Sequence, residues 1–300
     1  SGQRAAAMRW PVGRDLGPTP MLWTRPDDPN DVLRHEDRRT LRVTRVLAAW
    51  LGIRHFPEQM FRDVYIGAPG HGFVRHYMVG FEGALGTDWL LDSIADAFDP
   101  TRDDTPGRLL LPTLGFYPMS EDIPPTSAGI TGVALYEANV DLDEHPIKPP
   151  FAPHDRMRAD DGYWIAKRLA RLEERTLDEA IQAGELSDVR ARRYLRSAIA
   201  LRRRDLLRTL YRRVTPVDVV SVRAGMLHLI DREGGKQRYR VEVTDASGEA
   251  IAPSRIVTAR TARFGIPVDF DSAIVVRIFK GDRARSLDVH LKRRLSGVEH

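Results

Sequence analysis

The 300-residue sequence contains no cysteine. This absence excludes disulfide bonds, metal sites built on thiolates and a cysteine nucleophile. A chain without cysteine is compatible with a reducing or an oxidising compartment, so the composition leaves the location open.

The sequence also lacks long apolar runs. No stretch approaches roughly eighteen consecutive apolar residues, and the first residues, SGQRAAAMRWPVG, do not have the basic-then-apolar layout of a secretion signal. We therefore expect no transmembrane segment and no visible targeting sequence. Hydrophobic residues make up 42% of the sequence and charged residues 29%, which is typical of a globular protein that buries a core.

Lysine is scarce, with five lysines against 41 arginines at a net charge of +4. Two interpretations are open: a GC-rich coding bias favours arginine everywhere, or guanidinium groups recognise phosphate or carboxylate ligands. The first lysine is Lys148. Kinase-like sites usually anchor the nucleotide phosphates with a lysine on an N-lobe strand, and no such lysine precedes the segment Arg75 to Gly86 discussed below.

Three regions follow one another along the chain. Residues 1–31 are rich in proline and predict an extended leader. Residues 32–214 predict a mainly helical part with one β-hairpin, and residues 215–300 alternate apolar and polar residues as short strands do. The predicted fold class is therefore α+β, in which a mainly helical domain is followed by a small antiparallel β-sandwich.

Within the middle region the pattern predicts several elements. A first helix is expected to begin near Asp31 as its N-cap and to end at Gly52, and two strands follow around a turn at Gly67–Gly72. A long helix is expected from Asp160 to Ala183, and another over about 188–214.

The helix predicted over about 188–214, which Ser187 would cap, is strongly basic. Between Val189 and Val214 it carries ten arginines and one acid, Asp205, so the charge of this stretch is +9 and the rest of the chain carries −5. Such segregation predicts an anion-binding surface for nucleic acid, acidic lipid or an acidic protein. The candidate contacts are Arg193, Arg196, Arg204 and Arg208. Alternatively the arginines pair with acids of the same chain, and the scarcity of stacking aromatics favours this interpretation and argues against nucleic acid.

The segment RHYMVGFEGALG, Arg75 to Gly86, follows the predicted hairpin. Phosphotransferases of the protein-kinase type need a catalytic-loop Asp, an Asn five residues later and a further Asp after a hairpin, because these groups orient the hydroxyl and hold Mg²⁺. The stretch LRVTRVLAAWLGIRHFPEQMFRDVYIGAPGHGFVRHYMVGFEGALG resembles, in order and length, uncharacterised bacterial proteins with a kinase-like C-lobe, whose pattern is aaW, HxDxxxxN, a hairpin and HYLIDFGsalG.

The resemblance extends to RPDDPNDVLRHEDRRTLR, RADDGYWIAKRLARL and LSDVRARRYL, and covers about residues 8–216. It implies a kinase-like C-lobe for this region. It also implies relatives of the cell envelope that carry an N-lobe and an export signal, neither of which this sequence shows. The cell envelope is thus an expectation of the resemblance alone, and the location is otherwise unknown.

At the four matched positions this sequence departs from the family pattern. Ile53 replaces the first His, His55 the catalytic Asp, Met60 the Asn and Gly80 the metal-binding Asp. A thioether and a glycine offer no oxygen ligand, and an imidazole suits Mg²⁺ poorly. We therefore expect no metal, no cofactor and no nucleotide binding at this motif.

Nearby carboxylates are candidate substitute ligands. They are Glu58, Asp63, Glu82 and Asp88. The alternative is that they are solvated or pair with Arg54, Arg62 and Arg75, which we favour because phosphoryl transfer depends on close placement of several groups. His71 and His76 show no metal-ligand pattern and are interpreted as surface or core residues, and the GAPGHG loop as a hairpin turn.

The sequence thus favours a catalytically inactive, pseudokinase-like binding or scaffold module with an unknown protein partner. Two alternatives stay open: an atypical phosphotransferase with remodelled metal ligands, and a module that binds anions or acidic partners through the arginine-rich helix. The sequence names neither the partner nor the oligomeric state.

Overall fold

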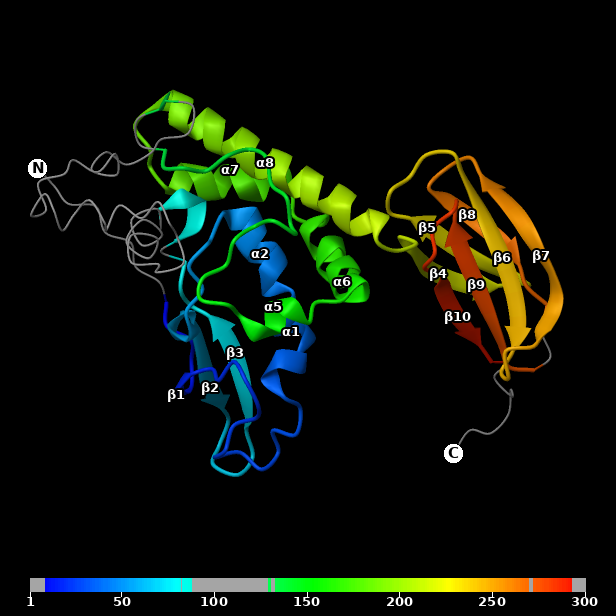
Figure 1. Cartoon of the computed structure of the whole chain (residues 1–300), viewed down its shortest axis with the longest axis horizontal. Coiled ribbons are helices and arrows are strands. Elements are labelled where there is room, and N and C mark those ends of the chain that lie inside the picture. The colour runs from blue at the N-terminus through cyan, green and yellow to red at the C-terminus, as the bar shows by residue number, and fades with distance from the viewer. Residues whose placement is uncertain (1–8, 82, 88–128, 131–132, 270–271, 293–300) are drawn as a thin grey trace, which may run out of the picture. The chain divides into compact units, whose positions relative to one another are not determined.

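The computed structural model describes residues 9–81, 83–87, 129–130, 133–269 and 272–292, and it contains both helices and antiparallel sheets (Figure 1). The α+β class is therefore confirmed. The chain divides into two compact units: the described residues of Ser1–Met157 and Leu172–Arg203, and those of Arg158–Arg171 and Arg204–His300. The boundary expected at residues 214–215 lies inside the second unit.

The first unit contains a three-stranded antiparallel sheet in the order β1-β2-β3 (Figure 1). Its helices and strands are β1 (Arg14–Pro18), α1 (Arg39–Arg42), α2 (Thr44–Leu51), β2 (Phe61–Ile66), β3 (Phe73–Met78), α5 (Ala152–Asp155), α7 (Glu174–Ala183) and the part of α8 (Val189–Arg212) up to Arg203.

The predicted hairpin is confirmed as β2 and β3, which are joined by a turn at residues 67–72. Gly67 adopts a φ of +116°, and a Cβ there would lie 2.7 Å from the Cα of Gly72, so the turn closes only because both positions lack side chains. Part of the predicted extended leader forms β1, whose Arg14 is opposite Tyr65 of β2.

The prediction of one helix that begins near Asp31 is wrong. The chain instead forms a 3₁₀ turn at His35–Asp37 and two short helices, α1 and α2. The Asp31 carboxylate accepts a hydrogen bond from the backbone N–H of Arg25 at 2.7 Å and contacts the His35 ring at 2.7 Å. It therefore stabilises the loop over residues 25–31 and does not act as an N-cap. The predicted end is correct, because Gly52 follows α2 with a φ of 74°.

The prediction of a single helix from Asp160 to Ala183 is also wrong, because α6 (Ala159–Leu169) and α7 are separate helices. Glu173 between them is extended, and the Arg203 guanidinium binds the carbonyl of Leu172 at 2.7 Å. The cap expected at Ser187 is displaced by one residue, because the Asp188 carboxylate accepts the backbone N–H of Arg190 at 2.7 Å.

One hydrophobic cluster joins the helices of the first unit to its sheet. It consists of Met21, Leu41, Ala48, Ile53, Phe56, Met60, Phe61 and Phe151. The rings of Phe56 and Phe151 meet edge to face with centroids 4.9 Å apart. This cluster fixes the loop between α2 and β2 against the start of the hairpin, which is where the motif positions lie.

The second unit is built on strands, with α6 and the end of α8 beside them. Two antiparallel sheets are ordered β10-β9-β6-β7 and β4-β5-β8. The strands are β4 (Val217–Arg223), β5 (Met226–Asp231), β6 (Gln237–Asp245), β7 (Ala250–Ala259), β8 (Arg263–Pro267), β9 (Ile274–Lys280) and β10 (Leu287–Leu291). Both sheets contribute to one buried cluster, with Leu229 of β5 and Val276 of β9 as examples.

Contacts between side chains hold α6 to these strands. The Tyr163 hydroxyl and the Lys167 ammonium lie 3.0 and 2.9 Å from the Asp218 carboxylate of β4. These charge-assisted hydrogen bonds explain why α6 belongs to the second unit although α5 and α7, its neighbours in sequence, belong to the first.

Candidate functional site

Two of the four motif positions lie next to each other. Met60 precedes β2 and Gly80 follows β3, and the Met60 carbonyl accepts hydrogen bonds from the backbone N–H groups of Val79 at 2.7 Å and Gly80 at 3.2 Å. Ile53 is fully buried after α2, whereas His55 forms an isolated parallel bridge with Lys148. The hairpin therefore brings Met60 and Gly80 together through their backbones.

The space beside Gly80 is already filled. A Cβ at this position would lie 2.7 Å from Cγ and 3.0 Å from Cα of Met60. Met60 is 2% exposed and packs in the hydrophobic cluster of the first unit. A carboxylate here would clash and be desolvated by apolar neighbours. Within the described parts of the chain, no three His, Asp or Glu side chains are grouped as a metal site would require.

The candidate substitute ligands do not gather at Gly80. Glu58 is exposed in the 3₁₀ turn before β2, and Glu82 and Asp88 lie outside the described residues. Asp63 is fully buried in β2. Its partner is Arg25 at 2.9 Å, so the expectation of a neighbouring arginine as its partner is wrong.

The arginines of α8 mostly pair within the chain. Arg196 binds Asp178 of α7, while Arg204 and Arg208 lie 3.4 and 3.9 Å from Asp205 of their own helix. Arg193 is exposed. Of the four candidate anion contacts, three thus have a carboxylate neighbour already, which weakens their electrostatic attraction for an external anion.

Arg202 of the same helix has a structural role that the charge pattern did not reveal. Its side chain is buried, its Nε lies 3.2 Å from the carbonyl of Ala49 and 3.1 Å from that of Trp50, and its guanidinium lies over the Tyr136 ring at 4.8 Å. The last carbonyls of a helix lack partners within it. Arg202 therefore completes the end of α2.

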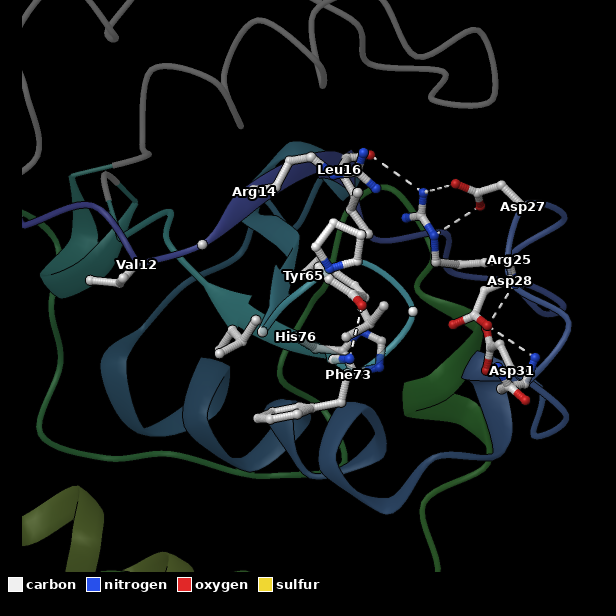
Figure 2. Close-up of a pocket in the computed structure, with 18 of the residues that line it drawn as sticks. Val12, Arg14, Leu16, Arg25, Asp27, Asp28, Asp31, Tyr65, Phe73 and His76 are labelled. Atoms are coloured by element: carbon white, nitrogen blue, oxygen red, sulfur yellow. Dashed lines mark hydrogen bonds and ion pairs between the residues drawn. The ribbon is translucent and has the colours of Figure 1, made fainter.

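A pocket with a volume of about 850 Å³ lies beside the hairpin, and Figure 2 shows the side chains that line it. Its walls come from β1, from the segment 25–31, from the hairpin turn and from β3. The charged lining residues are Arg14, Arg25, Arg38, Asp27, Asp28, Asp31 and His76. Apolar and aromatic side chains, among them Leu16, Tyr65 and Phe73, cover the rest.

A buried carboxylate supports this wall of the pocket. Asp63 Oδ1 accepts hydrogen bonds from the Thr19 hydroxyl and from Nδ1 of His76, both at 2.5 Å, and Oδ2 accepts one from Arg25 at 2.9 Å. Burial alone would raise the pKa of Asp63, but the hydrogen bonds from His76, Thr19 and Arg25 outweigh burial and lower the pKa to about 2. Asp63 is therefore ionised at neutral pH.

A second cluster holds the segment 25–31 in place. Asp31 contacts Nε2 of His35 at 2.7 Å and also binds Arg38, and Nδ1 of His35 lies 2.5 Å from the Pro20 carbonyl. Burial raises the pKa of Asp31, but hydrogen bonds from the Arg25 backbone and from His35 outweigh this effect and lower it. Both ring nitrogens of His35 thus lie within hydrogen-bonding distance of an oxygen atom.

The orientation of His76 follows from its bond to Asp63. Because the carboxylate only accepts hydrogen bonds, Nδ1 carries the proton and Nε2 is left for other partners. The side chain is 19% exposed and lines the pocket. The arrangement leaves Nε2 able to accept a hydrogen bond from a bound molecule, and the positively charged Arg14 lines the same pocket.

Comparison of the chain with protein-family models, with curated proteins and with solved structures found no match. In the portion of the chain that the structure describes, no helix is both long and apolar enough to cross a membrane, as expected.

Sequence reasoning missed the Asp63–His76 pair, although a signal for it was present. In an antiparallel hairpin with its turn at residues 67–72, Ile66 is opposite Phe73, and counting back along both strands places Asp63 opposite His76. No comparable signal existed for Arg25, which lies 38 positions before Asp63 in the chain.

Proposed function

We propose that this chain is a pseudokinase-like binding module that does not transfer phosphoryl groups and that binds its ligand in the pocket beside the hairpin. The observation that carries the first part is the packing of Met60 into the space beside Gly80. The kinase-like C-lobe corresponds to the first unit, and the second unit is a small antiparallel sandwich, since its two sheets share one core.

The order of elements supports the kinase-like assignment. Helix α2, the loop to Met60, strands β2 and β3 and then Gly80 follow one another as the helix, catalytic loop, hairpin and metal-binding turn do in the proteins that the sequence resembles. The contact between Met60 and Gly80 also fits two positions that share one metal ion in active relatives.

The chemistry of the site argues against an active phosphotransferase. Two oxygen ligands are replaced by a thioether and by a glycine whose missing side chain has no space to return. Asp63, one of the candidate substitute ligands, is bound to Thr19, Arg25 and His76. Recruiting it as a metal ligand would break three hydrogen bonds to a charged group.

The pocket provides the binding surface of this proposal. Its volume of about 850 Å³ lies in the range of ligand sites, which combine apolar walls with a few fixed polar groups. Arg14 lies 5.7 Å over the Tyr65 ring and has no carboxylate partner in the described part of the chain. The buried Nε of Arg38 likewise lacks a partner there. An aromatic or apolar group that bears an acid fits these walls.

Thermal denaturation at increasing concentrations of ATP and Mg²⁺ tests whether the positions of Met60 and Gly80 bind nucleotide and metal. Mg²⁺ with ATP should leave the melting temperature of the chain unchanged, as it should for a Met60→Asn/Gly80→Asp double variant. A ligand at a hundred times its dissociation constant stabilises a protein by about 2.7 kcal/mol, which such a titration detects. Stabilisation that needs both metal and nucleotide, or transfer of labelled phosphate to any acceptor, would contradict the proposal.

The pocket is tested with small probes. Benzoate and phenyl phosphate should shift the NMR signals of the His76 ring and of the hairpin amides, and benzyl alcohol, which lacks the charge, should have a weaker effect. Arg14→Ala should weaken binding of both anions at least tenfold. Arg62→Ala, which removes an arginine of β2 outside the pocket lining, is the control. Equal weakening by both variants would mean that overall charge, and not the pocket, attracts the probes.

A further inference from the structure

A lysine, an aspartate and a glutamate meet inside the second unit. Nζ of Lys280, the last residue of β9, lies 2.6 Å from Oδ2 of Asp231 and 2.6 Å from Oε2 of Glu233. The side chains of Lys280 and Asp231 are 3% and 1% exposed. Asp231 ends β5, so this contact joins a strand of the three-stranded sheet to a strand of the four-stranded sheet.

Two further donors are directed at the Asp231 carboxylate. The Tyr239 hydroxyl of β6 donates to Oδ2, the oxygen that also contacts Lys280. The backbone N–H of Glu233 donates to Oδ1 at 2.8 Å. Burial raises the pKa of Tyr239, and its bond to Asp231 raises it further, so this hydroxyl keeps its proton. Each carboxylate oxygen of Asp231 thus has a separate donor.

Glu233 is the remaining charged neighbour of the amine. It also accepts two hydrogen bonds from Arg283, at 2.8 and 3.0 Å. Burial would raise the pKa of Glu233, but the hydrogen bond and charge of Lys280, and then those of Arg283, lower it. Glu233 is therefore a carboxylate, and its side chain, at 26% exposed, is the one acid of the three-residue cluster in contact with solvent.

Burial of the charges of Lys280 and Asp231 favours a reaction that neutralises them. A buried ion pair loses the hydration of both charges, and the attraction between them often fails to compensate for that loss. An amide between the same two side chains carries no charge and needs only ordinary hydrogen bonds. The nucleophile, the carboxyl carbon and the groups that would move protons are already in contact.

We propose that Lys280 and Asp231 condense to an intramolecular isopeptide bond that links β5 to β9. A bond forms between Nζ of Lys280 and Cγ of Asp231, the Cγ–Oδ2 bond breaks, and one water molecule leaves. The ammonium and the carboxylate become a neutral amide, and both hydrogens of the water come from the ammonium. The step requires no oxidant, metal or cofactor.

Each neighbouring group has a role at the reacting atoms. Glu233 accepts a proton from the Lys280 ammonium, which frees the amine to attack Cγ. The backbone N–H of Glu233 stabilises the charge that develops on Oδ1. Tyr239 donates its proton to Oδ2, and the second proton of the attacking amine passes to the same oxygen, which then leaves as water. Glu233 passes the first amine proton on to Tyr239, so the hydroxyl is restored. This inference does not depend on the proposed function of the first unit.

The mass of the intact chain tests the proposal. We expect the full-length protein to be lighter than its sequence requires by the mass of one water molecule. Digestion at arginine should yield residues 224–232 and 278–283, AGMLHLIDR and IFKGDR, as a single branched peptide. Fragmentation of that peptide should place the branch between Asp231 and Lys280.

Substitutions assign the loss of water to this cluster. Lys280→Arg should restore the full mass, and Glu233→Gln should restore it or slow the loss at least tenfold. Lys236→Arg, at an exposed lysine five positions after Asp231, should keep the loss. A wild-type chain of full mass would show that the cluster is an ion pair only, and a loss that persists in Lys280→Arg would assign it elsewhere. Both results overturn the proposal, and the wild-type spectrum decides even where a variant fails to fold.

Discussion

Replacing Asp63 with asparagine should destabilise the first unit by about 3.5 kcal/mol at neutral pH. The change keeps the shape of the side chain but removes its charge and turns one oxygen into an amide donor. Asp63 is fully buried, and three donors, from Thr19, Arg25 and His76, converge on its two oxygens. An asparagine would place its amide group against at least one of them.

The magnitude follows from the pKa of Asp63. A pKa of about 2 in the folded chain, against the ordinary 3.8, corresponds to about 2.5 kcal/mol at about 1.4 kcal/mol per pKa unit. The amide facing Arg25 or His76 adds a desolvation cost of roughly 1 kcal/mol. Because the folded pKa is the lower one, this stabilisation is present above about pH 4 and is lost as the pH falls through about 2.

Urea denaturation followed by the fluorescence of buried Trp50 measures the effect. A Trp164→Phe background removes an indole of the second unit, so that the first unit contributes more of the signal. Asp15→Asn is the matched control: Asp15 is exposed on β1 and accepts one local hydrogen bond, from Gly17, so its replacement should cost less than about 0.5 kcal/mol.

Two results would refute the reasoning about Asp63. The first is a difference between wild type and Asp63→Asn below about 1 kcal/mol at pH 7, which would mean that the hydrogen bonds do not stabilise the charge. The second is a difference that stays constant from pH 7 to about pH 2.5, since the wild-type carboxylate must lose its advantage in that range.

Three further predictions concern other buried positions. Gly80→Ala should lower stability by about 2 kcal/mol in thermal denaturation because its Cβ would overlap Met60; a neutral result would mean that the loop shifts freely. Arg202→Met should lower stability by about 3 kcal/mol in the same assay, because the carbonyls of Ala49 and Trp50 at the end of α2 lose the hydrogen bonds that Arg202 donates. Arg204→Met, at an exposed position of the same helix, should change stability by less than about 0.5 kcal/mol. Equal effects of the two variants would contradict the structural role of Arg202. Burial lowers the pKa of His154 from 6.5 to about 3, so the unfolded chain takes up a proton that the folded chain does not, and stability should fall by about 1.4 kcal/mol per pH unit from pH 6 to pH 4. His154→Phe should reduce the pH dependence measured in urea denaturation by about that amount, while His145, whose pKa burial lowers to about 4, keeps its own contribution. An unchanged pH dependence would contradict the assignment to His154.

Local patterns predicted those parts of the fold that depend on neighbouring residues. The turn at residues 67–72 and the end of α2 at Gly52 were both predicted, because glycine reaches conformations there that other residues avoid. The alternating strands of the second unit were predicted for the same kind of reason, since a period of two is a property of the backbone.

The helix predictions failed where distant groups compete for the same atoms. Asp31 is a good N-cap by type, but its carboxylate binds Arg25, His35 and Arg38 in the folded chain. Similarly, the period of the pattern continued through residues 170–173, where Arg203 binds an unwound carbonyl. A sequence window does not contain these partners, so propensity alone could not place either boundary.

The sequence by itself determined that Met60 and Gly80 have no oxygen atom in their side chains. Only the tertiary structure decided that these two positions touch, and that Asp63, His76 and Arg25 meet at the wall of one pocket. Composition gives the hydrogen-bond donors and acceptors of a chain. The strength of the hydrogen bonds that they form depends on burial and on a partner within hydrogen-bonding distance. Both of these arise only when strands and loops far apart in the sequence close on one another.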